Sequence, residues 1–169
     1  HDIKNHLLIL DGMLRKGQLE ESRTYLQKLD AMSTALFFPY QTGNPVVDIL
    51  LGEKLGLAAA NHMKTNVSVV LPKSCGIEDV DWCVIFANAL DNALNACRAL
   101  EGERQMSSSG KRQGDFYLLE FQNTCAEHTE VKMRTGLSNI QSVAEKYHGA
   151  ILMQQESGTF SLSVLLNIS

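Results

Sequence analysis

The sequence predicts an α+β protein in which a helical hairpin precedes a β-sheet with helices laid on one face. Apolar residues among the first 38 positions recur at intervals of four, three and four, as they do along a narrow helical seam. Beyond residue 42, helical patterns alternate with short runs that are typical of strands. The two patterns meet at Thr42-Gly43-Asn44-Pro45, which is a turn signal. We therefore expect two domains, residues 1–42 and residues 43–169.

The first domain is predicted to contain two helices joined by a turn at Gly17. Short helices with narrow seams bury little apolar surface by themselves. We therefore expect an antiparallel hairpin that pairs with a second copy of the chain in a dimeric four-helix bundle. The seam residues are Ile3, Leu7, Leu10 and Leu14 in the first helix and Tyr25, Leu29, Met32 and Leu36 in the second.

The second domain is predicted to begin with a helix that runs to about Asn61, because Pro45 suits a first helical turn. A strand is expected at residues 67–71, where Pro72 ends it. An apolar helix should then cover residues 82–100. Its N-cap candidates are Asp79 and Asp81.

The rest of the chain is predicted to complete the sheet. Residues 101–114 are polar and include three successive serines, so we expect a loop there. Strands are expected at residues 116–121, 150–153 and 160–164. A further helix precedes the last two strands, and Gly149 is its expected C-cap. The seam of this helix consists of Leu137, Ile140, Ala144 and Tyr147.

A stripe of polar residues along the apolar helix of residues 82–100 is the strongest functional signal. Asparagine is a mediocre helix former, and burying its amide without a partner costs on the order of 1–3 kcal/mol. Side chains at this spacing lie on one side of a helix, where they need something polar to face. Carboxylate and amide oxygens suit a phosphate-bearing ligand that carries Mg²⁺. This polar stripe consists of Asn88, Asp91, Asn92 and Asn95.

Composition and charge exclude several classes of protein. A net charge of −4 without a basic stripe argues against a nucleic-acid binder. No apolar run approaches the ~20 residues that span a membrane. The four cysteines lack the spacing of a metal site, which suits a reducing, cytoplasmic compartment. Because the chain begins with His1 instead of Met, we expect a fragment whose upstream part supplies any membrane anchor.

The start of the first helix carries a chemically useful pair, in which His1 is followed by Asp2. His1 and Asn5 are four residues apart on the side opposite the seam, so they are expected to face solvent. Neutral imidazole is a nucleophile near neutral pH, and a carboxylate can orient the ring through one nitrogen. Taken alone, the same features also describe an ordinary exposed residue at a chain end.

Four segments together resemble sensor histidine kinases of two-component systems, in the subgroup typified by peptide-pheromone receptors. They are HDIKNH from residue 1, TGNPVVDILLGEK from residue 42, NALDNALNA from residue 88 and TGLSNIQSVAEKYHGAI from residue 135. The first matches the phosphoacceptor segment of that family, and the third matches its asparagine-rich "N box". The resemblance covers nearly the whole chain. It implies that an α/β-sandwich ATP-binding domain of the histidine kinase and gyrase type, from the GHKL ATPase superfamily, follows the hairpin.

The resemblance implies ATP-dependent autophosphorylation of a histidine and phosphotransfer to an aspartate of a response-regulator receiver domain. His1 would accept the γ-phosphate, Asp2 would accept the ring proton, and Asn5 would help to position water for the reverse, phosphatase reaction. The implied partners are a second copy of the chain and the receiver domain. The chain would be the cytoplasmic domain of a membrane-anchored receptor, connected to the membrane through a missing upstream sensor region.

The same resemblance implies that ATP and Mg²⁺ bind at the polar stripe. Asn92 would be the principal Mg²⁺ ligand, Asn88 would lie near the phosphates one turn earlier, and Asn95 would belong to the same nucleotide site. An amide at Asn88 cannot act as a base, which fits delivery of phosphate to a histidine instead of water.

Two positions depart from the family pattern. A helix start at Gly136 or Leu137 offers free backbone N–H groups to a phosphate, as helix N-termini do. Arg134, however, stands where the family has the first glycine of Gly-x-Gly, and it would either contact a phosphate or crowd the site; an ordinary helix entry is the alternative. Asn123 stands in place of the aspartate of Asp-x-Gly and would accept a hydrogen bond from the adenine amino group. Residues 126–135 would form a shortened ATP lid.

Three hypotheses of different class follow from the sequence. The first is a sensor histidine kinase core. The second is a phosphotransfer or scaffold protein with a degenerate nucleotide site that does not bind ATP, suggested by Arg134 and the missing Asp-x-Gly. The third is a structural dimerisation module, which leaves the polar stripe without an explanation. Labelling with ATP that carries ³²P at the γ-phosphate separates the three.

Overall fold

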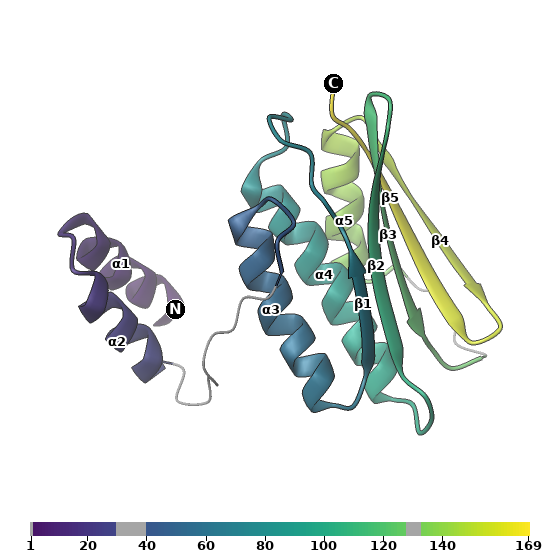
Figure 1. Ribbon diagram of the computed structural model, residues 1–169, viewed down its shortest axis with the longest axis horizontal. Helices are drawn as coiled ribbons and strands as arrows, with labels where there is room; N and C mark the ends of the chain where they lie inside the picture. The colour runs from purple at the N-terminus through teal and green to yellow at the C-terminus, as the bar shows by residue number, and fades with distance from the viewer. Residues whose placement is uncertain (1, 30–39, 128–132) are drawn as a thin grey trace. The chain divides into compact units, whose positions relative to one another are not determined.

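The computed structural model describes residues 2–29, 40–127 and 133–169. The chain divides into two compact units, His1–Leu36 and Phe37–Ser169, and each is described by itself (Figure 1). The boundary expected after residue 42 stays a prediction. Of the predicted seam residues, Met32 and Leu36 lie outside the described residues.

The first unit is a helical hairpin, as predicted. Helix α1 spans Asp2–Arg15 and helix α2 spans Leu19–Leu29. The chain reverses at Gly17, whose φ of +71° lies in the left-handed region that favours glycine. His6 Nδ1 lies 2.7 Å from the Tyr25 hydroxyl, and this hydrogen bond joins the two helices.

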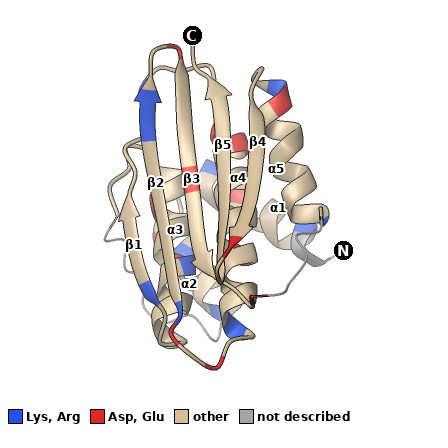
Figure 2. Ribbon diagram, turned by 90° about the vertical axis from the view of Figure 1, so that its right-hand side faces the viewer, with Lys and Arg blue, Asp and Glu red and all other residues tan. Residues whose placement is uncertain are grey.

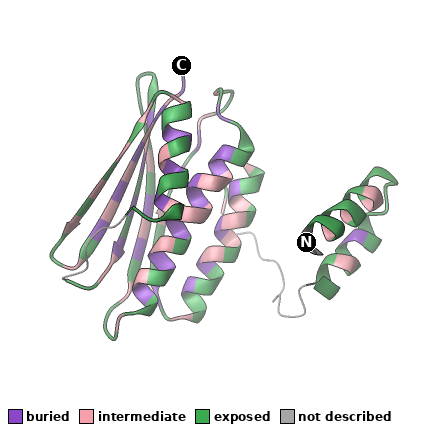
Figure 3. Ribbon diagram, turned by 180° about the vertical axis from the view of Figure 1, so that it is seen from behind, coloured by how far each residue is buried: buried purple, intermediate pink, exposed green. Residues whose placement is uncertain are grey.

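The hairpin buries little of its apolar surface within the unit (Figure 3). Among its described positions, Ser22 is the buried residue, and it is polar. A helix pair with so much exposed apolar surface has almost no core of its own. The exposed apolar residues, here called the hairpin leucine set, are Leu7, Leu8, Ile9, Leu14, Leu19, Leu26 and Leu29.

The second unit is a five-stranded sheet with helices on one face (Figures 1 and 2). The strand order is β1-β2-β3-β5-β4, in which β1 runs parallel to β2 and the other neighbours are antiparallel. The helices are α3 (Pro45–Ala60), α4 (Asp79–Arg98) and α5 (Thr135–Lys146). The strands are β1 (Lys64–Ser68), β2 (Gln105–Gln113), β3 (Phe116–Thr124), β4 (Ala150–Glu156) and β5 (Thr159–Asn167).

The core lies between the sheet and the helices and is centred on α4. Side chains of β3 and β5 alternate between buried and more exposed positions, as expected for a sheet with one covered face. The ring of Phe86 meets that of Phe121 edge-on, with centroids 5.4 Å apart. Trp82 and Tyr117 make a similar contact at 5.9 Å. These aromatic contacts fix the buried side of α4 and thereby orient its opposite, polar side.

An anchored turn formed by Thr42 and Asn44 precedes α3. The backbone amide and the hydroxyl of Thr42 both donate to Asp48 Oδ1, each at 2.7 Å. Asn44 is the N-cap of α3, and its Oδ1 accepts from the amides of residues 46 and 47. Its Nδ2 also donates to Asp79 Oδ1 at 2.7 Å, in the first turn of α4. The start of α3 predicted from Pro45 is therefore confirmed.

Two expectations about the first strands were wrong. The strand expected at residues 67–71 is β1, at Lys64–Ser68, because the amide of Leu71 donates to Thr42 O instead of to a sheet neighbour. The loop expected at residues 101–114 contains β2, which pairs with both β1 and β3. Backbone hydrogen bonds to two neighbouring strands outweigh the weak strand preference of its serines. Ser108 is buried, whereas Ser109 is exposed on the other face.

The expected N-cap of α4 was also wrong. Glu78 occupies the N-cap position and forms no side-chain cap, whereas Asp79 and Asp81 lie inside the first turn. Both aspartates are bonded elsewhere, Asp79 to Asn44 and Asp81 to residues of the α5 end. Tertiary partners therefore compete with local capping for these carboxylates.

The predicted C-cap of α5, Gly149, is not the residue that ends the helix. Tyr147 is the C-cap, and His148 has the positive φ of +53°. The amides of His148 and Gly149 donate to the carbonyls of residues 145 and 144, as in a Schellman motif. Gly149 is required for another reason, because a Cβ there would lie 1.7 Å from Leu165 O.

Candidate functional site

The polar stripe of α4 borders solvent along the helix. Asn88 and Asn92 are half-buried, whereas Asp91 and Asn95 are exposed. The opposite side of α4 is fixed in the core by Trp82 and other apolar residues. The stripe therefore forms an accessible row of amide and carboxylate groups.

Asn88 approaches the start of α5 closely. Its Nδ2 donates to the carbonyl of Val84 at 2.7 Å, and its Oδ1 takes no part in that bond. A Cβ built on Gly136 would lie 3.1 Å from this Oδ1, which is tighter than an ordinary contact. The structure thus brings together Asn88 and Gly136, two predicted site residues that are 48 positions apart in the sequence.

The N-terminus of α5 offers backbone donors beside Asn88. The helix begins at Thr135, one residue before the predicted start, with Arg134 as N-cap. Arg134 has no acceptor to cap the helix, and its side chain forms no cap hydrogen bond. The first helical hydrogen bond runs from the Ser138 amide to the Arg134 carbonyl, at 2.9 Å. The preceding amides, including those of Gly136 and Leu137, therefore lack intrahelical partners and fit an anion.

Leu137 and Arg134 take different places at this helix start. The side chain of Leu137 is buried, so only its backbone amide can contribute to a site. Arg134 is exposed, and its guanidinium can approach a bound anion from solvent. Arg134 therefore does not have to block the start of α5.

Asn123 lies near the end of β3 and is 4% exposed. Its Nδ2 donates to the carbonyl of Thr124 at 2.9 Å. Within residues 40–127 and 133–169, no side chain or backbone group donates to its Oδ1. The sulfur of Cys97, in the last turn of α4, lies 3.6 Å from the same Thr124 carbonyl, which places this end of β3 against the stripe helix. A buried amide with an available oxygen fits the predicted contact with an adenine amino group.

An ion pair that the sequence interpretation missed lies on the α3 side of the stripe. Lys54 Nζ is 2.7 Å from Asp91 Oδ1. The Lys54 side chain is only 16% exposed, whereas the Asp91 side chain is 51% exposed. A single lysine within the apolar helix PVVDILLGEKLGLAAA was the signal that could have indicated a buried partner.

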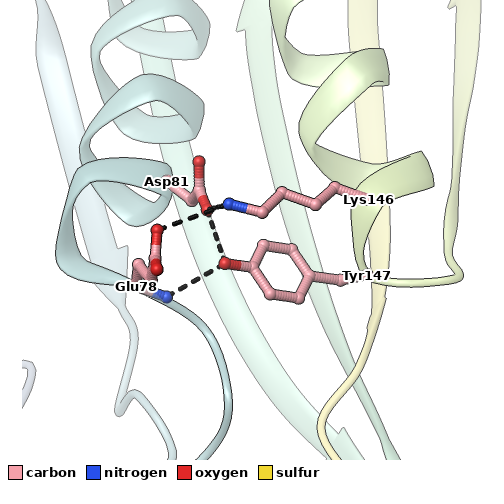
Figure 4. Close-up of polar contacts among 4 residues, drawn as sticks. All are labelled: Glu78, Asp81, Lys146 and Tyr147. Atoms are coloured by element: carbon pink, nitrogen blue, oxygen red, sulfur yellow. Dashed lines mark hydrogen bonds and ion pairs between the residues drawn. The ribbon is translucent and has the colours of Figure 1, made fainter.

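A second polar cluster joins the other ends of α4 and α5 (Figure 4). The Asp81 carboxylate accepts hydrogen bonds from Lys146 Nζ at 2.7 Å and from the Tyr147 hydroxyl. Lys146 also lies 3.4 Å from a carboxylate oxygen of Glu78, whose amide donates to the Tyr147 hydroxyl oxygen. Burial alone would raise the pKa of Asp81, but hydrogen bonds from Lys146 and Tyr147 outweigh it and lower that pKa. This cluster holds α5 in register along α4.

The predicted residues of the hairpin are described only in part. His1 lies outside the described residues, as does the side chain of Asp2, although Asp2 is the first residue of α1. Asn5 is exposed on α1, as predicted. Part of the predicted ATP lid, residues 128–132, also lies outside the described residues. The roles assigned to His1, Asp2 and Asn5 remain predictions.

Comparison with known families decides how this fold is classified. Residues 77–167, which are more than half of the chain, match the family model of the GHKL domain. The chain belongs to the GHKL domain family. The matched residues of this GHKL domain include the polar stripe, Asn123 and the start of α5. Comparison with curated proteins finds no significant match.

Solved structures of histidine kinases share the fold of this GHKL domain. A nucleotide-free catalytic domain of the histidine kinase ThkA is 10% identical, with a TM-score of 0.61 over 74% of this chain and 92% of that chain. The histidine kinase AdeS of Acinetobacter baumannii is 11% identical, with a TM-score of 0.59 over 100% and 98% of the two chains. A histidine kinase of Burkholderia phymatum is 13% identical, with a TM-score of 0.60 over 100% and 88%.

These comparisons confirm the predicted fold class and the resemblance to the catalytic core of sensor histidine kinases. The GHKL domain is a nucleotide-binding fold, and the Asn88–Gly136 approach lies within the matched residues. Within the part of the chain that the structure describes, no helix is long and apolar enough to span a bilayer.

Proposed function

We propose that this chain is the catalytic core of a sensor histidine kinase, which phosphorylates His1 with ATP and transfers the phosphate to an aspartate of a response regulator. The observation that carries the proposal is the meeting of the polar stripe with the uncapped N-terminus of α5 at Asn88 and Gly136. Amide oxygens on one side and free backbone N–H groups on the other suit a polyphosphate and its cation. Membership of the GHKL family supports a nucleotide as the ligand.

The nucleotide is proposed to bind between the stripe and α5. The amides of Gly136 and Leu137 would donate to phosphate oxygens, with Arg134 adding charge from the exposed side. Asn123 Oδ1 would accept a hydrogen bond from the adenine amino group. Asn88 and Asn95 would flank the phosphates on the stripe, and neither can act as a base toward water.

Asn92 is the proposed Mg²⁺ ligand, because its amide lies in the middle of the stripe and is only half-buried. Bound Mg²⁺ would neutralise phosphate charge during phosphoryl transfer. Amide oxygen is a suitable ligand for this hard cation, and phosphate oxygens and water would complete the coordination.

The phosphoacceptor step is proposed for the start of α1. A ring nitrogen of His1 would attack the γ-phosphorus, so that a nitrogen–phosphorus bond forms while the bond from phosphorus to the leaving ADP oxygen breaks. Asp2 would accept the proton from the other ring nitrogen, which keeps the ring nucleophilic. Asn5, which is exposed one turn later, would position water for the reverse, phosphatase reaction.

The partners proposed for the chain follow from the hairpin. Its exposed leucine set supports pairing with a second copy in a four-helix bundle. The receiver domain of a response regulator would take the phosphate from His1. We further propose that the chain acts in the cytoplasm and is linked to a membrane through an upstream sensor region.

Labelling with ATP that carries ³²P at the γ-phosphate tests the proposed kinase. With Mg²⁺, the wild-type chain should acquire acid-labile label, and His1→Gln should abolish it. Asn92→Asp should lower the labelling rate by about a hundredfold or more, because it disturbs the metal site and adds a negative charge beside the phosphates. His148→Asn is the matched histidine control, because asparagine tolerates the positive φ of that residue.

The possible results separate the hypotheses. Label that survives in His1→Gln would contradict His1 as the acceptor. Nucleotide binding without any label would contradict autophosphorylation. If ATP does not bind but a phosphorylated partner labels His1, the phosphotransfer alternative with a degenerate nucleotide site is correct.

A further inference from the structure

Asp91 introduces a negative charge into a stripe that otherwise consists of neutral amides. It is adjacent to Asn92, three residues after Asn88 and four residues before Asn95. Side chains three or four positions apart on a helix have Cβ atoms about 5–6 Å from each other. An anion bound along the three asparagines therefore lies within range of the Asp91 charge.

Lys54 neutralises this charge from the neighbouring helix. Its Nζ lies 2.7 Å from Asp91 Oδ1, and its side chain is 16% exposed. The side chain of Asp91 is 51% exposed, so its carboxylate borders solvent, and Lys54 reaches it from α3. Removing one member of such a pair leaves the other charge uncompensated.

We propose that Lys54 determines the phosphate-charge preference of the nucleotide site, by neutralising Asp91 and so allowing a triphosphate to lie along the stripe. This inference rests on the proposed nucleotide site. Lys54 acts through Asp91 and is therefore a positioning and charge-setting residue. Without it, the Asp91 carboxylate repels every bound phosphate, and the repulsion grows with the number of phosphate charges.

The experiment measures affinities for adenosine, ADP and ATP by competition against a fluorescent ATP analogue, with EDTA and again with Mg²⁺. The variants are Lys54→Met, Asp91→Asn and the double variant that carries both. Lys64→Met is the matched control, because it removes one lysine charge from the exposed pair of Lys64, on β1, with Glu103. Thermal unfolding of each variant checks that the domain remains folded.

Lys54→Met should leave adenosine affinity unchanged and weaken ATP binding more than ADP binding. For one added charge within about 10 Å of the phosphates, the ATP-to-ADP affinity ratio should fall by about threefold to tenfold. The change should be larger at low salt, because salt screens the exposed carboxylate. The double variant should recover the wild-type ratio, because both charges are then absent.

Three results with the variants would overturn the proposal. The first is an equal loss of affinity for adenosine, ADP and ATP in Lys54→Met, which indicates a purely structural role. The second is a double variant no better than Lys54→Met, and the third is the same ratio change in Lys64→Met. Absence of any nucleotide binding by the wild-type chain would contradict this proposal as well as the proposed nucleotide site. Normal binding with no label on His1 would contradict only the proposed kinase reaction.

Discussion

Asp81 is a buried carboxylate that the fold keeps ionised. Its two donors, Lys146 and Tyr147, come from the end of α5, so the charge is compensated only when α4 and α5 are packed together. The hydrogen bond between Lys146 and Asp81 favours the charged form of both groups. It therefore raises the pKa of Lys146 and helps to lower the pKa of Asp81. The two shifts describe one interaction that exists in the folded state.

Asp81→Asn should change how the stability of the fold depends on pH. The folded-state pKa of Asp81 is below its unfolded value, so its contribution is complete above about pH 4 and is lost as the pH falls through the folded-state pKa. We expect the variant to lose about 1–3 kcal/mol of unfolding free energy at pH 7. Urea denaturation should show a smaller difference between wild type and variant at pH 3.

Tyr147→Phe is the control for this prediction. It removes one hydrogen bond to Asp81 but keeps the ion pair with Lys146, so most of the pH dependence should remain. A difference between wild type and Asp81→Asn that is the same at pH 7 and pH 3 would show that the charge of Asp81 does not stabilise the fold.

Helical spacing was sufficient to predict the polar stripe but not the residues that contact it. Asn88 and Asn92 were found because a 3.6-residue period places them on one side of α4. The pairing of Lys54 with Asp91 joins two helices, and no spacing rule connects positions on different helices. That Gly136 and Asn88 belong to one nucleotide site was expected only through resemblance to a family. The Lys54–Asp91 pair and the Asn88–Gly136 approach both depend on how the helices pack, which sequence periodicity does not predict.

At Gly149, between α5 and β4, the backbone lies so close to β5 that only a glycine fits. A Cβ on Gly149 would lie 1.7 Å from the carbonyl oxygen of Leu165 on β5, a backbone atom that cannot rotate away. We therefore expect Gly149→Ala to lower the unfolding free energy by about 2 kcal/mol or more. Chemical denaturation measures this change.

Gly102→Ala is the matched control, because a Cβ at Gly102 would meet nothing within 4 Å. The control should change the unfolding free energy by less than about 0.5 kcal/mol. Equal stability of the two variants would mean that the junction relaxes freely around an alanine at residue 149.

Helices were predicted better than the strands with polar sequences. Apolar periodicity marks a helix even without its neighbours, and α3 starts where Pro45 indicates. β2 carries Ser107, Ser108 and Ser109, and its strand character comes from pairing with β1 and β3. A strand whose stability comes from its neighbours cannot be recognised from its own residues.

The two units differ in how far each can stabilise itself. The second unit has a continuous core, with side chains such as Ile85 and Leu119 fully buried. The described part of the hairpin exposes its leucine set and buries only Ser22. We therefore expect the hairpin, and not the GHKL domain, to depend on a partner chain.

Substitution of the hairpin leucine set tests this expectation. Leu7 and Leu14 are 60% and 57% exposed, and Leu7→Glu combined with Leu14→Glu should convert a dimer to a monomer. Light scattering after size-exclusion chromatography measures the mass. Leu152→Glu on β4 is the matched control, because this leucine is 58% exposed but lies on the sheet.

Nucleotide affinity should be unchanged in the monomeric variant, since the core that the structure describes within residues 40–127 and 133–169 is built from residues of the second unit. A wild-type chain that is already monomeric at micromolar concentration would contradict the expected four-helix bundle. So would loss of the dimer in Leu152→Glu but not in the hairpin variant.

The anchored turn at Thr42 and Asn44 has a consequence for anyone who wishes to isolate the nucleotide-binding half as an autonomous fragment. Cutting the chain at Pro45, where α3 begins, would remove the cap of α3 and the Asn44 bond to Asp79 on the stripe helix. It would also leave Asp48 without the two donors of Thr42. The shortest fragment that keeps both helix starts intact therefore begins at or before Thr42.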